Sequence, residues 1–176
     1  HAERNIRQIL AHYKNHPAII GYQIDNETAP TGAVTPYTTA AFIDHLKRKI
    51  DAGATRAITQ FFFEVDTYLR FVEKCRARGI EAEIVPGILP VTNVAQLKKF
   101  AAMCGTAVPS WLDTLLAGLD EKPELRHLIA AMVAAEQCRM LMLAGVQHFH
   151  FYTLNRAELT QAICHILGIR TATRAA

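Results

Sequence analysis

The chain has 176 residues, of which 51% are hydrophobic and 20% are charged, with a net charge of +3 and four scattered cysteines. This composition predicts a globular domain with a real core, and it argues against disorder, nucleic-acid binding and a disulfide framework. The longest apolar stretch, residues 128–145, contains Glu136 and Arg139 and therefore indicates a buried or amphipathic helix, not a membrane span.

Helical and strand patterns alternate along the chain. We expect helices at residues 3–13, 39–52, 66–78, 94–103, 123–144 and 157–167, with a short one after Pro109. We expect strands at residues 18–24, 57–63, 82–89 and 149–154, and a loop at 30–38. This order predicts an α/β fold with a parallel sheet, and the lack of a G-x-G-x-x-G motif favours a (βα)8 TIM-type barrel over a dinucleotide-binding fold. Four strands make a partial barrel, so we expect one such domain over residues 1–176, with 171–176 as a tail.

Three of the expected strands end in polar clusters, within residues 57–66, 83–93 and 148–158. The carboxyl ends of parallel strands are where α/β enzymes keep their chemistry, so these ends predict the functional face. The Pro86-Gly87 pair inside a strand predicts a bulge or a close backbone approach. Asn93 is the expected N-cap of the helix that follows.

Four strings carry a resemblance to a known family: LKRKIDAGATRAITQFFFEVDTYLRF, IEAEIVPGILPVTN, GLDEKPELRHLI and HFHFYTLNRAELTQAICHILGIR. In this order, over residues 46–170, they resemble the C-terminal half of bacterial methylenetetrahydrofolate reductase. The resemblance implies a cytoplasmic flavoprotein oxidoreductase of one-carbon metabolism and methionine biosynthesis. In that family NADH reduces FAD, and the flavin reduces 5,10-methylenetetrahydrofolate to 5-methyltetrahydrofolate.

The resemblance also implies roles for particular residues. Gln60 resembles a folate-contacting glutamine, whose amide can donate to and accept from a pterin edge. Gln96 and Phe100 resemble residues that contact folate and stack at the flavin face, and their spacing places them on one side of a helix. Arg156 matches a substrate-binding position, where a guanidinium can hold a carboxylate. Lys49 matches a residue that contacts FAD; the alternatives are a core aromatic for Phe100 and a solvated cation for Lys49.

Residues 1–45 carry a different resemblance, through NHPAIIGYQIDNET. This string is similar to a βα unit of glycoside hydrolase family 42 β-galactosidases, which implies Glu27 as the general acid/base and Asn26 near the sugar's 2-hydroxyl. The alternative is a solvated carboxylate after a strand. A retaining glycosidase needs a second carboxylate close by, and its nucleophile strand is lacking, so glycosidase activity is not expected. The two resemblances together raise the hypothesis of a chimera of two barrel enzymes.

Half a barrel has open sheet edges, which predicts either a homo-oligomer or a missing N-terminal barrel half. Independent catalysis is not expected, because the strands that supply most of the flavin pocket have no counterpart in this sequence. The alternative function is that of an inactive chimeric scaffold that dimerises, and a second alternative is a fragment of a retaining β-galactosidase with Glu27 as its acid/base. We expect no metal site, because His148 and His150 have no evident third ligand, and no nucleic-acid or membrane partner.

Overall fold

The computed structural model describes residues 36–104, 106–119 and 121–170. The helix expected at residues 3–13, the strand expected at 18–24 and the tail at 171–176 lie outside the described residues, as do Asn26 and Glu27.

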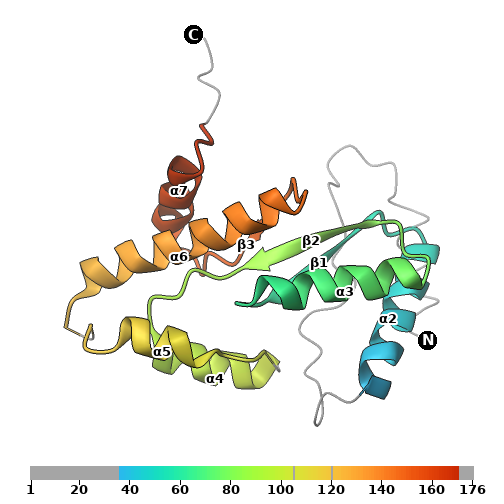
Figure 1. The fold of residues 1–176 in the computed structure, drawn as a ribbon, viewed down its shortest axis with the longest axis horizontal. Helices are drawn as coiled ribbons and strands as arrows, with labels where there is room; N and C mark the ends of the chain where they lie inside the picture. Colours follow the sequence, from blue (N-terminus) through green and yellow to red (C-terminus); the bar gives the residue numbers. More distant parts are fainter. Residues whose placement is uncertain (1–35, 105, 120, 171–176) are drawn as a thin grey trace.

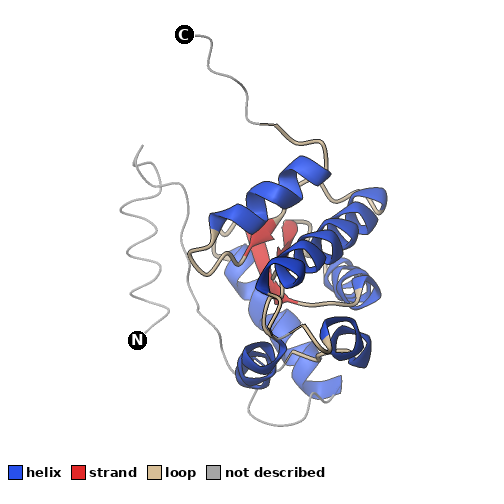
Figure 2. Ribbon diagram, turned by 90° about the vertical axis from the view of Figure 1, so that its left-hand side faces the viewer, coloured by secondary structure: helices blue, strands red, loops and turns tan. Residues whose placement is uncertain are grey.

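The described part is an α/β fold with a parallel sheet, which confirms the predicted class. Its elements are α2 (Pro36–Asp51), β1 (Arg56–Phe61), α3 (Val65–Ala77), β2 (Glu83–Ile88), α4 (Val94–Cys104), α5 (Ser110–Leu116), α6 (Pro123–Leu143), β3 (His150–Phe151) and α7 (Ala157–Ile166). The three strands are parallel, in the order β1-β2-β3 (Figure 1). Figure 2 shows helices on several sides of these short strands, an arrangement consistent with part of a TIM-type barrel.

Glycines end the helices where the sequence predicts them to end. At the end of α3, Gly79 has a φ of 71° and its N–H donates to the Arg76 carbonyl at 2.9 Å, while the Ile80 N–H donates to the Cys75 carbonyl at 3.1 Å. This pair of bonds is a Schellman motif, and its left-handed residue favours glycine. The same pair of bonds follows α6 at Gly145. Local sequence therefore fixes where the helices stop.

Two expected boundaries are wrong by three residues. Residues 36–38 were expected in a loop, but α2 begins at Pro36, because proline suits the first turn of a helix, where its missing N–H costs nothing. The last strand was expected at residues 149–154, but β3 contains only His150–Phe151. The Tyr152 N–H still donates to the Ile88 carbonyl at 2.9 Å, and a tight turn then takes the chain away from the sheet.

The core forms two clusters around β2, which is the most buried strand. The first cluster lies between the sheet and α2, α3, α6 and α7, and contains Ile43, Phe62, Tyr68, Cys75, Ile80, Ile84, Ile88, Ala131, Ala134, Ala135, Cys138, Leu141 and Ile163. The second cluster joins the carboxyl end of the sheet to α4 and α5, and contains Phe61, Leu89, Val91, Leu97, Ala101, Leu112 and Leu116. The small buried residues of α6 allow this helix to pack closely. No helix within the described ranges is long and apolar enough to cross a membrane.

A bulge interrupts the pairing of β1 with β2. Ile58 pairs with Val85 but Phe61 pairs with Gly87, so β1 carries one extra residue in the interval. The Gly87 N–H donates to the Thr59 hydroxyl at 3.0 Å. A Cβ atom on Gly87 would lie 2.5 Å from the Thr59 carbonyl oxygen, so only glycine fits. This confirms the bulge and the close approach predicted from Pro86-Gly87, with the extra residue on the neighbouring strand.

Charged side chains meet near the amino ends of the strands. Glu83 on β2 pairs with Arg56 on β1 at 3.2 Å and also contacts the His148 ring, just before β3. His150 packs its ring edge-on against Tyr152, with centroids 4.7 Å apart. The two histidines thus have different surroundings, and no group of three His, Cys, Asp or Glu side chains among the described residues could hold a metal ion.

Candidate functional site

A groove lies beyond the carboxyl ends of β2 and β3. It has a volume of about 140 Å³ and is lined by Pro90, Thr92, Gln96, Tyr152, Thr153, Leu154, Arg156 and Leu159. The loop after β2 and the start of α4 form one wall, and the loop after β3 with the start of α7 forms the other. This is the face that the polar strand ends predict, and the groove brings together two of the predicted site residues, Gln96 and Arg156.

The first wall is held by a helix cap. Asn93 accepts the Gln96 N–H on its side-chain oxygen at 2.8 Å, and its carbonyl accepts the Leu97 N–H at 2.9 Å. The prediction of Asn93 as an N-cap is therefore confirmed. The cap fixes the first turn of α4, and Leu97 is buried in the second cluster. Gln96 is exposed beside this anchored residue, with its amide available to a ligand.

The second wall ends in a strained turn. The Arg156 N–H donates to the Thr153 carbonyl at 2.9 Å, and the two residues between them, Leu154 and Asn155, have φ values of 48° and 62°. Two positive φ values in the middle of a four-residue turn are typical of type I′, which favours Asn and Gly. Leucine in this conformation is uncommon, and such strain is concentrated at functional sites. The turn places Arg156 immediately before α7.

Gln60 lies in the β1 bulge and outside the groove lining. It is partly buried, and its side-chain oxygen accepts the N–H of Phe61 at 3.1 Å. Bulges often redirect a side chain next to an active site. The amide nitrogen of Gln60 therefore remains the group that could meet a substrate, and the predicted folate contact stays a prediction.

Phe100 and Lys49 are not among the groove residues. The Phe100 ring stacks on Phe61, with centroids 5.5 Å apart and planes 10° apart, and it packs against the second cluster. Lys49 lies in the last turn of α2, which Figure 1 shows at the opposite end of the molecule from α7. Phe100 thus has a packing role in the described part, and the roles of Phe100 and Lys49 toward substrate and FAD stay predictions.

Tyr152 is a groove residue that the sequence reasoning missed. Its hydroxyl donates to the Thr59 carbonyl at 2.9 Å, and its ring packs edge-on against Phe61 at 6.2 Å. Thr92, Thr153 and Leu159 were missed as well. The FYTLN string marked the segment, but an apolar run does not show which of its side chains turn toward a groove.

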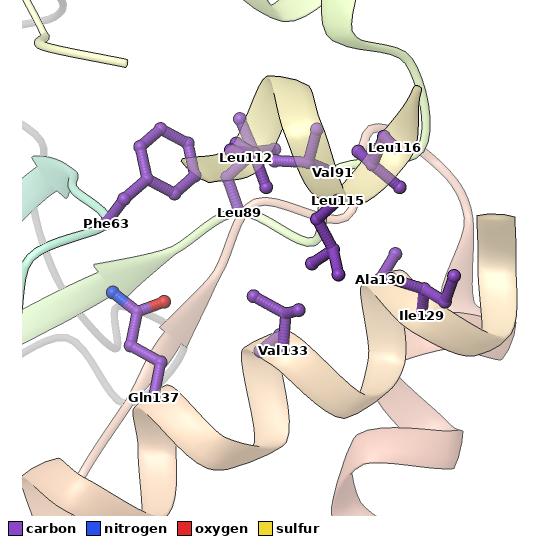
Figure 3. Close-up of a pocket in the computed structure, with 11 residues that line it drawn as sticks. Phe63, Leu89, Val91, Leu112, Leu115, Leu116, Ile129, Ala130, Val133 and Gln137 are labelled. Carbon is purple, nitrogen blue, oxygen red and sulfur yellow. The ribbon is translucent and has the colours of Figure 1, made fainter. Parts of the chain in front are cut away.

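A second hollow lies between α5 and α6, and Figure 3 shows leucines of α5 pointing toward Ile129 and Val133 of α6. Its volume is about 10 Å³, so it holds at most one water molecule. Gln137, at its edge, donates to the Phe62 carbonyl at 2.7 Å. This hollow is therefore a packing seam.

The groove offers one cation, one amide and two hydroxyl groups beside an aromatic ring. A guanidinium binds a carboxylate through two parallel hydrogen bonds, and the Gln96 amide can both donate and accept. The Tyr152 ring and Leu159 supply apolar contact. The arrangement is suited to binding one end of an anionic ligand with an apolar or aromatic body.

The chain is similar to known proteins over most of its length. The family model described as Methylenetetrahydrofolate reductase matches residues 21–168. The 5,10-methylenetetrahydrofolate reductase of Pectobacterium carotovorum subsp. carotovorum is 59% identical over 126 residues, which are 72% of this chain and 42% of the relative. The Escherichia coli (strain K12) protein of that name is 55% identical over 126 residues, covering 72% of this chain and 43% of the relative. The chain thus spans less than half the length of these bacterial relatives.

Two further proteins are similar at lower identity. Methylenetetrahydrofolate reductase (NADH) 1 of Arabidopsis thaliana is 34% identical over 138 residues, or 78% of this chain and 23% of the relative. A solved structure, an uncharacterized protein from Clostridium thermocellum that binds two copies of 5-methyl-5,6,7,8-tetrahydrofolic acid, has a TM-score of 0.46 at 15% identity and covers 73% of this chain and 47% of its own. The family match includes Asn26 and Glu27, and the glycosidase resemblance and the chimera stay hypotheses.

Proposed function

The chain belongs to the methylenetetrahydrofolate reductase family, and we propose that it supplies the folate-binding wall of an enzyme that reduces 5,10-methylenetetrahydrofolate to 5-methyltetrahydrofolate. One observation carries the proposal: Gln96 and Arg156, which come from different βα units, line the same groove. Two residues that the family resemblance assigns to substrate binding thus meet in one place.

The chemistry of the groove fits a folate. Folates carry glutamate carboxylates at one end, and the Arg156 guanidinium can bind such a group. Gln96 can hydrogen-bond to a neighbouring amide, while Tyr152 and Leu159 contact an aromatic body. Whole ligand pockets usually measure about 300–1,000 Å³. The groove of about 140 Å³ therefore holds part of the molecule, and we assign Gln60 and Phe100 to the part that lies beyond it.

FAD would supply the hydride for the reduction, and NADH would supply it to FAD. Lys49, which the resemblance matches to a contact with FAD, lies on α2 and does not line the groove. We therefore propose that flavin binding needs polypeptide beyond the described residues, in keeping with a chain that spans 42% of a bacterial relative. The part played by this chain is to hold and orient the folate.

We further propose that the chain associates with another polypeptide, either a second copy or an N-terminal barrel half. Ile58 on β1 is 52% exposed and Leu143 on α6 is 76% exposed. Apolar side chains at a sheet edge and on a helix face commonly mark such contacts. A cytoplasmic location is part of the proposal, since Cys75, Cys138 and Cys164 are free thiols.

Calorimetric titration of the chain with 5-methyltetrahydrofolate tests the proposal. Arg156→Gln should weaken binding by about tenfold or more, because a charged hydrogen bond contributes about 1.5–3 kcal/mol. Arg70→Gln is the control, since Arg70 is an exposed arginine on α3 that bonds only within its own helix turn in the described structure. Equal affinity for the Arg156 and Arg70 variants, or no binding by the unmodified chain, would contradict the proposal.

A second experiment concerns the cofactor. After FAD is added and free ligand is removed, the absorbance spectrum should show no retained flavin for the chain alone. Flavin should be retained after mixing with the N-terminal half of a bacterial relative, and size-exclusion chromatography should show the larger complex. Concentration-dependent dimerisation without binding of either ligand would support the inactive scaffold instead.

A further inference from the structure

We propose that Tyr152 is a positioning residue that couples the Gln60 bulge to the Arg156 turn. The inference rests on the proposed function, because it concerns how the folate groove is held in shape. It goes beyond that function by assigning a role to a side chain that no resemblance or comparison assigns.

The geometry begins with the space above Gly87. A Cβ atom at Gly87 would lie 2.5 Å from the Thr59 carbonyl oxygen and 2.6 Å from Cε2 of Tyr152. Real Cβ atoms do not approach other atoms so closely. Because Gly87 has no side chain, the Tyr152 ring can occupy this space. The ring starts on the β3 side of the sheet and passes over β2. Its hydroxyl then reaches β1, where it donates to the Thr59 carbonyl at 2.9 Å.

This hydrogen bond reaches the bulge. Bulged residues are excluded from the regular ladder, and a partly buried carbonyl group needs a partner. The Thr59 hydroxyl accepts the Gly87 N–H at 3.0 Å, and the Thr59 carbonyl accepts the Tyr152 hydroxyl. The next residue after Thr59 is Gln60. The tyrosine therefore stabilises the backbone conformation that directs Gln60.

The backbone of Tyr152 leads into the turn that precedes α7. Its own N–H continues the ladder by donating to the Ile88 carbonyl at 2.9 Å, so both its backbone and its ring are held. His150 and Phe61 pack edge-on against the ring, at 4.7 Å and 6.2 Å between centroids. Thr153, the first residue of the turn, follows, and after it come the strained residues 154 and 155. An anchored residue just before the turn supports a conformation that leucine rarely adopts by itself.

Tyr152→Phe tests the proposal, because it keeps the ring and removes the hydroxyl that donates to the Thr59 carbonyl. Binding of 5-methyltetrahydrofolate should weaken about fivefold, the effect of one neutral hydrogen bond. The Arg156 side-chain Nε–H resonance should shift in the NMR spectrum, and the Arg156 amide should exchange faster with solvent. In an Arg156→Gln background the same change should weaken binding less than twofold, since coupled residues are not additive.

Tyr68→Phe is the matched control. The Tyr68 hydroxyl also donates to a strand carbonyl, that of Ile84 at 2.6 Å, but it lies in the first cluster on α3. The Tyr68→Phe change should lower stability without shifting the Arg156 resonance. Strictly additive effects of the Tyr152 and Arg156 changes, or an unchanged Arg156 resonance and amide exchange in Tyr152→Phe, would overturn the coupling.

Failure of the inference can be distinguished from failure of the proposed function. If the unmodified chain does not bind the folate, the proposed function fails, and the Arg156 resonance and amide exchange still decide the inference. If Tyr152→Phe does not fold, the unmodified chain decides it. Its Tyr152 hydroxyl proton should be protected from exchange with solvent enough to detect by NMR. A freely exchanging hydroxyl would contradict the hydrogen bond to Thr59.

Discussion

Replacing Gly87 by alanine should strongly destabilise the protein. The added Cβ would lie 2.5 Å from the Thr59 carbonyl oxygen, 2.6 Å from Tyr152 Cε2 and 3.3 Å from the Gln60 carbonyl carbon. Two of these three atoms belong to the backbone, so a side-chain rotation cannot relieve the contact. Strands β1 and β2 would have to separate locally at the bulge.

The size of the effect follows from three contributions. Overpacking costs about 1–3 kcal/mol. Loss of the Tyr152–Thr59 and Gly87–Thr59 hydrogen bonds adds about 1 kcal/mol each. Alanine lowers the entropy of the unfolded chain, which offsets about 0.4–1 kcal/mol of this destabilisation. We expect a net loss of about 2–4.5 kcal/mol, a large fraction of a typical stability of about 5–15 kcal/mol.

Urea denaturation followed by circular dichroism measures this loss. Gly79→Ala is the control, because no atom lies within 4 Å of its added Cβ and its cost comes only from a φ of 71°. That cost should be about 1–2 kcal/mol. A Gly87→Ala protein within 0.5 kcal/mol of the unmodified chain, or more stable than Gly79→Ala, would refute the packing argument; these thresholds are on the order of measurement error in such experiments.

Three further predictions concern stability and reactivity. Gln137→Leu should cost about 1–3 kcal/mol in urea denaturation, because it leaves the buried Phe62 carbonyl without its 2.7 Å donor, and a neutral result would contradict this. Burial, with a smaller effect of Cys164, raises the pKa of Cys138 from 9.0 to about 12; the neutral thiol is favoured in the folded state, so stability should be lost as pH rises from 9 toward 12. Iodoacetamide should therefore label Cys138 far more slowly than the partly exposed Cys164, and equal rates would refute the prediction. Leu154→Asn should raise the melting temperature through a gain of about 0.5–1 kcal/mol, because Asn tolerates a positive φ, and a lower value would show that the leucine side chain contributes packing.

Local signals predicted most of the described fold. Gly79 and Gly145 mark helix ends because only a left-handed residue completes the Schellman motif there, and Asn93 marks a helix start because its side chain caps an N–H. The Pro86-Gly87 pair predicted a close approach. Each of these signals acts over a few neighbouring residues, which is why a single sequence reveals it.

The site was only partly predictable, because its geometry depends on contacts between distant residues. The resemblance assigned Gln96 and Arg156 to substrate binding; both line the groove, and their roles toward a substrate stay predictions. It did not show that Phe100 would stack on Phe61, since a helix pattern cannot say which apolar partner a ring will find. The turn at Leu154 could not be predicted either, because leucine disfavours the conformation that it adopts.

The two walls of the groove stand on different parts of the core. The wall that bears Gln96 is anchored through Leu97 in the second cluster, whereas α7, which follows Arg156, is anchored through Ile163 in the first. Segments that belong to separate clusters can open separately at less than the full cost of unfolding. A ligand that spans the groove would therefore act as a crosslink between two cooperative units. Its arrival should slow amide exchange in α4 and α5 more than in β2, whose Ile84 and Ile88 are buried in the first cluster.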